Sequence, residues 1–193
     1  MSDINYVPQL HDYLETERQI LSRLDLEAVS RLMNLMEEAR QNHKRIFICG
    51  NGGSAATASH FVCDFCKGVS LNQEVKYDFE CLSDNIPLMS AIANDISYDD
   101  VFLIPLKAKL HEGDLVIGIS GSGNSENVVR AIRYAREHGA KTAALVGYSG
   151  GRLLEEAEHA VHVQIDNMQI VEDVHMILDH VMMYVLAGQE KSC

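Results

Sequence analysis

The sequence predicts an α/β fold, a five-stranded parallel sheet with helices on both faces. From residue 44 onward, short apolar stretches alternate with segments of helical periodicity. Several of these stretches are continuously apolar, which is typical of parallel strands covered on both faces. Two of them run into turns of small residues, at 50–54 and 120–125, before a helical pattern begins. Together these features favour a three-layer, flavodoxin-like arrangement.

The 193 residues are enough for one well-buried domain, and no linker rich in Pro, Gly or Ser divides them. We therefore predict a single domain over residues 1–193. Strands are expected near 45–49, 79–82, 114–119, 141–147 and 160–165. Helices are expected near 54–68, 86–95, 99–110, 125–138 and 168–187.

Two amphipathic helices are expected before the first strand, between about residues 7 and 43. Apolar residues recur at helical spacing on both sides of Asp25. As a hairpin beside the α/β core, these helices would need a surface against which to bury their apolar stripes. We expect them to be used in oligomerisation, and packing on the chain's own sheet is the alternative.

The composition excludes several classes of partner. A net charge of −12 without a clustered basic surface argues against nucleic acid. No basic-then-apolar leader and no apolar run of spanning length is present, so we expect a cytoplasmic protein without membrane contact. The five cysteines predict reduced, mostly buried thiols. A metal or redox role for Cys63-x-x-Cys66 is disfavoured, because no second Cys pair accompanies it.

The two small-residue turns predict one phosphate site. Each follows a strand and opens a helix, where free backbone N–H groups and the helix dipole favour an anion. Glycines let the anion approach the backbone, and serine hydroxyls add donors. Neither turn carries the lysine of a nucleotide-binding P-loop. A small phosphorylated molecule is therefore the expected ligand, at the carboxyl ends of the strands.

Ionisable residues on two helices predict acid/base or metal chemistry. His60 and Asp64 lie four apart on one helix face, although such a pair is often only solvated. The last helix is apolar but is interrupted by Glu172, Asp173, His175, Asp179 and His180. Burying these groups is costly unless they pair or bind a metal, and a charged outer stripe is the alternative. Glu172 and His180 are about 12 Å apart along the helix, so sharing of one ion between subunits is favoured.

Asn94 and Asp95 end the predicted helix over 86–95. Asp95 could bind sugar hydroxyls, but a helix stop followed by a new N-cap explains the pair equally well.

Taken together, these motifs resemble the sugar isomerase (SIS) domain family, and within it the phosphoheptose isomerases. The resemblance covers nearly the whole chain. It rests on the N-terminal helices, Cys49 to Ala56 with His60, Ala91 to Asp95, Gly118 to Asn127, and the last helix with His175 and His180.

The resemblance implies a homotetramer with active sites between subunits and one Zn²⁺ per subunit. The metal ligands it implies are His60, Asp64, Glu172 and His180. The catalytic acid/base residues would be Asp64 and His180, with Glu172 in place of Asp64 as the alternative. The phosphate would be held by Ser120, Gly121, Ser122 and Ser125. The remaining substrate contacts would come from Asn51, Gly52, Gly53, Ser54, Asp64, Asn94, Asp95 and Glu172.

Three departures from the family pattern leave the exact substrate open. The family usually has Glu at position 64, Gln at 172 and Thr at 121, where this chain has Asp64, Glu172 and Gly121. Asp64 is one methylene shorter than the usual Glu, so its carboxylate would lie farther from the substrate. The anionic Glu172 could offset that change. Gln169 could supply the missing amide.

The function that this pattern predicts is an aldose–ketose isomerase. It would convert sedoheptulose 7-phosphate to D-glycero-D-manno-heptose 7-phosphate by a metal-assisted enediol mechanism, for heptose-containing surface polysaccharides. The alternatives are the same chemistry on a different sugar phosphate, and a non-catalytic SIS tetramer that binds a replication-initiator protein.

Overall fold

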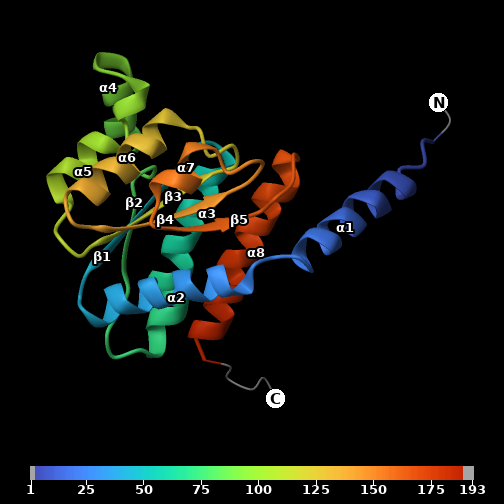
Figure 1. The fold of residues 1–193 in the computed structure, drawn as a ribbon, viewed down its shortest axis with the longest axis horizontal. Helices are drawn as coiled ribbons and strands as arrows, with labels where there is room; N and C mark the ends of the chain where they lie inside the picture. Colours follow the sequence, from blue (N-terminus) through green and yellow to red (C-terminus); the bar gives the residue numbers. More distant parts are fainter. Residues whose placement is uncertain (1–2, 189–193) are drawn as a thin grey trace.

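The computed structural model describes residues 3–188, and its centre is the expected parallel sheet. The five strands are β1 (Arg45–Gly50), β2 (Asp78–Cys81), β3 (Leu115–Ser120), β4 (Lys141–Val146) and β5 (His159–His162). All neighbouring strands are parallel, in the order β2-β1-β3-β4-β5. This is the doubly wound, flavodoxin-like order, so the predicted fold class is confirmed (Figure 1).

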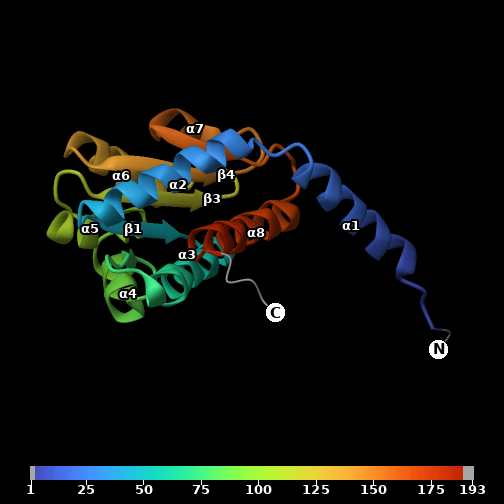
Figure 2. The same ribbon diagram turned by 90° about the horizontal axis from the view of Figure 1, so that it is seen from below.

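Helices cover both faces of the sheet (Figure 2). One face packs against α2 (Leu26–Gln41), α3 (Gly53–Cys63) and α8 (Met168–Leu186). The other packs against α4 (Ile86–Asp95), α5 (Leu103–Lys109), α6 (Glu126–Glu137) and α7 (Gly151–Glu156). Alternate residues of each strand pack into the two hydrophobic cores, for example Ile46 and Ile48 on the first face and Phe47 on the second. Both faces are therefore dry, as continuously apolar strands require.

The two N-terminal helices are present but lie in different surroundings. Asp25 caps α2, its side chain accepting a hydrogen bond from the N–H of Ala28 at 3.0 Å. Helix α2 packs on the sheet of its own chain. Helix α1 (Val7–Leu21) has no buried residue and projects from the body, so the two do not pair as a hairpin (Figures 1 and 2). Helix α2 therefore packs on the chain's own sheet, as the alternative expected, whereas α1 contacts that core through the partly buried Tyr13, Ile20 and Leu21.

Local structure differs from the sequence-based expectation at three places. The helix expected over 54–68 changes to a π-helix at Asp64–Val69, followed by a 3₁₀ turn at Ser70–Asn72. The helix expected over 99–110 is split into a 3₁₀ turn at Tyr98–Asp100 and α5. Helix α7 was not expected, because six residues are too few to give a periodic signal.

The cysteines follow the expectation only in part. Cys49 and Cys81 are buried free thiols, but Cys63 and Cys66 are exposed, so the prediction of burial is wrong for that pair. They lie on the outward side of the α3–π-helix segment, whose inward side is taken by Phe61 and Phe65. Cys193 lies outside the described residues.

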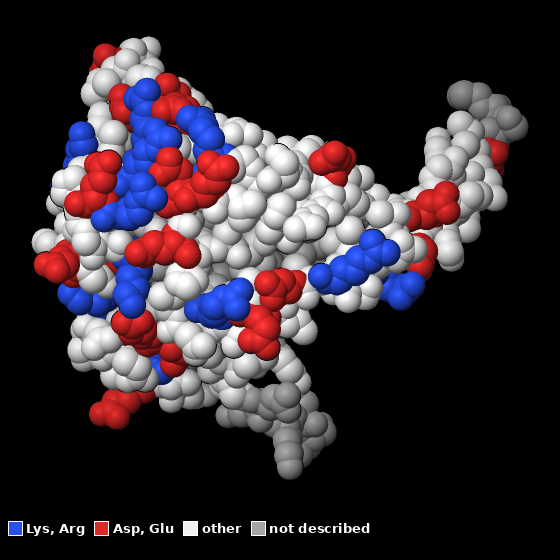
Figure 3. Space-filling model, viewed as in Figure 1, with Lys and Arg blue, Asp and Glu red and all other residues white. Residues whose placement is uncertain are grey.

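Charged residues are unevenly distributed over the face of the molecule seen in Figure 3. Figure 3 shows both signs interspersed over α5, α6 and α7, and few charged atoms between that region and α1. None of the described helices combines the length and hydropathy needed to span a bilayer.

Candidate active site

A cavity of about 150 Å³ lies where the carboxyl ends of β1 and β3 meet. Because Gly50 pairs in register with Ile119, the two small-residue turns that follow these strands lie side by side. The cavity is lined by Asn51, Ser54, Ile119, Ser120, Gly121, Ser122, Ser125, Met168 and Glu172. The two turns therefore form one pocket, as their positions in the sequence indicated.

The N-terminus of α6 borders this cavity through Ser125. The side chain of the N-cap residue Ser125 makes no capping hydrogen bond to α6. Its Oγ instead lies 3.1 Å from the Oγ of Ser120. First-turn N–H groups of a helix lack intrahelical partners, and α6 is long enough to carry a dipole. Hydroxyls and backbone donors thus converge where the dipole favours a phosphate.

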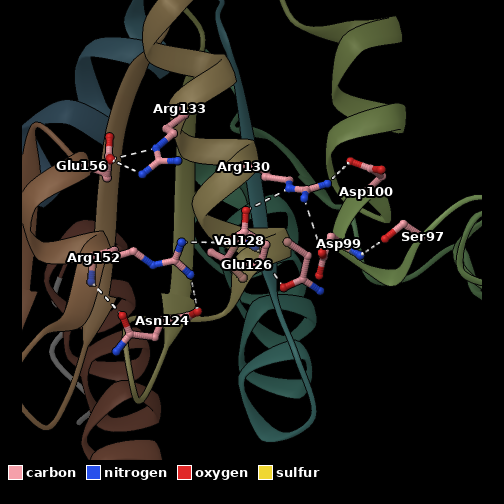
Figure 4. A network of polar contacts seen from close by, with 11 residues as sticks. Ser97, Asp99, Asp100, Asn124, Glu126, Val128, Arg130, Arg133, Arg152 and Glu156 are labelled. Carbon is pink, nitrogen blue, oxygen red and sulfur yellow. Dashed lines mark hydrogen bonds and ion pairs between the residues drawn. The ribbon is translucent and has the colours of Figure 1, made fainter.

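The turn that carries these serines is held rigidly from behind. Gly123 has φ of +66°, and a Cβ there would lie 1.9 Å from the carbonyl oxygen of Gly150. Arg152 donates to the carbonyl of Asn124 at 2.8 Å and to Glu126 at 2.7 Å (Figure 4). Only glycine fits at position 123, and the arginine ties the turn to α7. The donors are therefore preorganised before any ligand binds.

The N-terminus of α3 lies next to the carboxylate of Glu172. Gly52, its N-cap, has φ of +54° and ψ of −121°, a conformation that only glycine adopts readily. The carboxylate of Glu172 lies directly over Gly53, so close that a Cβ at 53 would lie 2.4 Å from Oε2. A carboxylate is favoured at this positive helix end. The positive end of α3 is therefore already next to a carboxylate of the chain itself.

Gly121 shapes the same cavity. A Cβ at this position would lie 2.6 Å from the Sδ of Met168. The space of a side chain at 121 is therefore filled by Met168 from the start of α8.

Asn51 is fixed by two partners outside the cavity lining. Its amide exchanges a reciprocal pair of hydrogen bonds with the amide of Asn127, both 2.9 Å. The hydroxyl of Tyr98 donates to the Oδ1 of Asn51 at 2.8 Å.

A cluster of two imidazoles and two carboxylates lies between α3 and α8. The Nε2 atoms of His60 and His180 are 3.0 Å apart. His60 Nε2 lies 3.6 Å from Asp64 Oδ2 and 3.9 Å from Asp179 Oδ2. One ligand atom from each of the four residues lies within 4.8 Å of the others. All four belong to one chain, so these ligands do not need to be shared between subunits.

This cluster fits a metal ion. In a tetrahedral zinc site with bonds of about 2.0–2.2 Å, neighbouring ligand atoms are about 3.4 Å apart, close to the spacings seen here. Asp179 is fully buried, and neither carboxylate oxygen has a hydrogen-bond partner among the described residues. Burial, aided by the nearby Asp64, raises the pKa of Asp179 from 3.8 to about 7. A cation in the cluster would satisfy this orphaned carboxylate.

Other sequence-predicted residues lie apart from this cluster. Glu172 contributes no ligand atom to the cluster described here and faces the cavity instead. Asn94 and Asp95 are exposed at the end of α4, where Asn94 donates to Asp95 at 2.8 Å, and they do not line the cavity. His175 is buried outside the cluster, and burial lowers its pKa to about 4.

Sequence reasoning overlooked Asn127 and Tyr98 as partners of Asn51. It named Asp179 among the ionisable residues of the last helix but did not include it among the expected metal ligands, although a buried acid needs a partner. No sequence pattern shows which side chains of α3 and α8 meet.

Comparisons with known proteins identify the family and agree with the fold. Residues 12–147 match the family model described as SIS domain. A "Probable phosphoheptose isomerase" of Thermoplasma volcanium is 34% identical over 177 residues, covering 92% of this chain and 90% of that protein. A "Phosphoheptose isomerase" of Helicobacter pylori is 34% identical over 156 residues, 81% of each chain. The solved phosphoheptose isomerase of Neisseria gonorrhoeae superposes with a TM-score of 0.86 at 26% identity, covering 94% of this chain and 98% of that one.

Proposed function

The chain belongs to the SIS domain family as one of its phosphoheptose isomerases, and from that premise we propose that it converts sedoheptulose 7-phosphate to D-glycero-D-manno-heptose 7-phosphate. Its product would serve heptose-containing surface polysaccharides, and the reaction would take place in the cytoplasm. The observation that carries the proposal is the placement of an anion cavity and an imidazole–carboxylate cluster along the same pair of helices.

The spacing of these two features suits the two ends of one sugar phosphate. His60 follows Gly53 by seven residues on α3, a rise of about 10 Å. The phosphate would be bound by Ser120, Ser122 and Ser125 at the N-terminus of α6. The binding energy of the phosphate would fix the position of the sugar, so that its carbonyl end lies toward the imidazoles.

Zinc is the proposed metal. His60, Asp64, Asp179 and His180 would hold it, a two-imidazole, two-carboxylate set that suits this ion. When bound, the metal supplies Lewis-acid polarisation of the sugar's carbonyl end. Glu172, predicted as a ligand from the family pattern, is instead proposed to accept hydrogen bonds from sugar hydroxyls, since its carboxylate lies at the cavity.

Proton transfer is assigned to the chain's own acids and bases. Asp64 would remove a proton from C1 of the ketose, and the C–H electron pair would form the enediol double bond. One oxygen of Asp64 faces His60, which leaves its other oxygen for this proton. His180 would return a proton to C2 while the proton of the C1 hydroxyl moves to the oxygen on C2, leaving an aldehyde at C1 and a hydroxyl at C2. Glu172 is the alternative base.

We propose a homotetramer with active sites between subunits. Helix α1 has no fully buried residue in its own chain, and its Leu10 and Leu14 are 61% and 63% exposed. Val181 and Tyr184 near the end of α8 are also exposed, at 46% and 62%. A second copy is the partner that would cover these apolar surfaces, as symmetric oligomers do. Asn94 and Asp95, exposed on α4, would reach the substrate of a neighbouring subunit.

The test follows sedoheptulose 7-phosphate in D₂O by proton NMR. We expect an aldoheptose 7-phosphate that carries solvent deuterium at C2, with turnover lost after chelation and restored by Zn²⁺. Product without deuterium would contradict the assignment of proton removal and proton return to two different residues. Full turnover after verified metal removal would contradict the metal's role.

A panel of five- and six-carbon ketose phosphates tests the substrate assignment. The tight packing of Gly121 against Met168 and the additional carboxylate of Asp179 are the features that favour a different sugar. Faster turnover of a shorter ketose phosphate would replace the heptose assignment. Ser125→Ala should mainly raise KM and Asp64→Asn mainly lower kcat. Ser90→Ala is the matched control, because Ser90 bonds only within exposed α4.

A further inference from the structure

The geometry points to a positioning unit of Tyr98 and Asn127 that holds the Asn51 amide so that one N–H is presented to the sugar. This inference rests on the proposed function and extends it to two residues outside the cavity lining. The three residues come from the segment after α4, the first turn of α6 and the turn after β1. They therefore join the segment that carries Asn94 and Asp95 to both small-residue turns.

One backbone donor, the N–H of Val128, determines the orientation of both amides. The N–H of Val128 donates to Asn127 Oδ1 at 3.0 Å, so the atom of Asn127 at that point must be oxygen. The same oxygen accepts from Asn51 Nδ2 at 2.9 Å. Asn127 Nδ2 must then face the oxygen of Asn51, also at 2.9 Å. A backbone group that cannot reverse its role thus fixes the amide of Asn51 through Asn127.

Counting hydrogen-bonding positions shows what remains for a ligand. Asn51 Oδ1 accepts from Asn127 and from the hydroxyl of Tyr98, so both of its lone pairs are used. Asn51 Nδ2 has two hydrogens, and one of them is donated to Asn127. The second hydrogen has no acceptor among the described residues, and Asn51 is one of the residues that line the cavity. Asn51 therefore presents a donor, suited to a carbonyl or hydroxyl oxygen of the sugar.

The partners of Asn51 are themselves held in place. Asn127 is 2% exposed. Tyr98 is 53% exposed, but the segment after it is tied to α6, because Arg130 contacts Asp99 at 3.4 Å and Asp100 at 2.9 Å (Figure 4). The Tyr98 hydroxyl therefore contacts Asn51 from a backbone segment that is held in place by α6. Without this hydroxyl, Asn127 alone would restrain the Asn51 amide.

The test is a double-mutant cycle on Tyr98→Phe and Asn51→Ala, with the sugar phosphate as substrate. In the wild-type background, Tyr98→Phe should lower kcat/KM about five- to tenfold, as expected for one lost hydrogen bond. In the Asn51→Ala background the same change should have less than about a twofold effect, since Tyr98 acts through Asn51. Inhibition by inorganic phosphate should stay unchanged, because the serine turn binds it. Tyr134→Phe is the control, a tyrosine on α6 whose ring stacks on His138.

Three results would overturn the inference. The first is a kcat/KM in Tyr98→Phe equal to that of the wild type. The second is a loss of kcat/KM on Tyr98→Phe that is as large in the Asn51→Ala background as in the wild-type background. The third is a weaker inhibition by phosphate in Tyr98→Phe, which would indicate general distortion of the site. Wild-type turnover is measured first, and its absence would contradict the proposed function separately. Crystal structures without substrate then give a readout independent of turnover. The inference expects a single Asn51 rotamer in the wild type and more than one in Tyr98→Phe, and an unchanged single rotamer would contradict it.

Discussion

Replacing Asp179 by Asn should change metal affinity and metal-free stability in opposite directions. The carboxylate is fully buried with no hydrogen-bond partner among the described residues, and burial raises its pKa from 3.8 to about 7. A raised pKa means that the folded chain loses stability as the pH rises from about 4 to about 7. At about 1.4 kcal/mol per pKa unit, the full loss above pH 7 is about 4 kcal/mol.

The amide of the Asp179→Asn variant carries no charge, so the metal-free variant should escape this loss. At pH 8 it should be more stable than the metal-free wild type by up to about 4 kcal/mol, and the difference should vanish near pH 4. Zn²⁺ affinity should fall by at least about tenfold, because the cluster loses its buried anionic ligand. Stability is measured by urea denaturation with chelator, and affinity by competition with a chromophoric chelator.

Asp166→Asn is the matched control, since Asp166 is exposed just before α8 and does not belong to the cluster. It should leave both quantities unchanged. If Asp179→Asn neither stabilises the metal-free chain nor weakens metal binding, the reasoning about the buried carboxylate is refuted. A loss of both stability and affinity would also refute it, because it would mean that Asp179 has a hydrogen-bond role in the metal-free chain.

Three further predictions concern pH, assembly and the phosphate turn. The hydrogen bond from Arg40 lowers the pKa of Glu37 below its ordinary 4.5, so the free energy of unfolding should fall as the pH drops below about 4.5. Glu37→Gln should make the urea midpoint less dependent on pH in that range. Leu10→Glu should cost a single chain almost nothing, because Leu10 is exposed, but should dissociate the proposed tetramer in analytical ultracentrifugation; an intact tetramer would remove α1 from the interface. Gly123→Ala should lower the melting temperature and weaken phosphate inhibition together, because its Cβ would lie 1.9 Å from the carbonyl of Gly150; unchanged inhibition would contradict the rigid turn.

The parts of the fold that follow from local chemistry could be predicted from the sequence. Continuous apolar strands and the small-residue turns after them are properties of short segments, so the sheet and both turns were found at their observed places. The break at Asp25 was also predicted, since an N-cap acts on its own neighbours. Helix α7 and the π-helix at Asp64 give no periodic signal and were missed.

The site could be predicted only as far as its residues act within one segment. The pairing of His60 with Asp64 follows from their spacing in the sequence, but the approach of His180 and Asp179 depends on how α3 and α8 pack. The hydrogen bond from Tyr98 to Asn51 joins residues 47 apart, and no local pattern predicts it. Cys63 was wrongly predicted to be buried, because some residues of an apolar helix still face outward.

A crystal structure of the zinc-loaded protein with sedoheptulose 7-phosphate, recorded with anomalous data at the zinc edge, tests the central claim most directly. The account predicts the phosphate against the hydroxyls of Ser120, Ser122 and Ser125, and zinc among His60, Asp64, Asp179 and His180. The carbonyl end of the same sugar should face that metal. A phosphate bound elsewhere, or a metal bound out of reach of the sugar, would contradict the account.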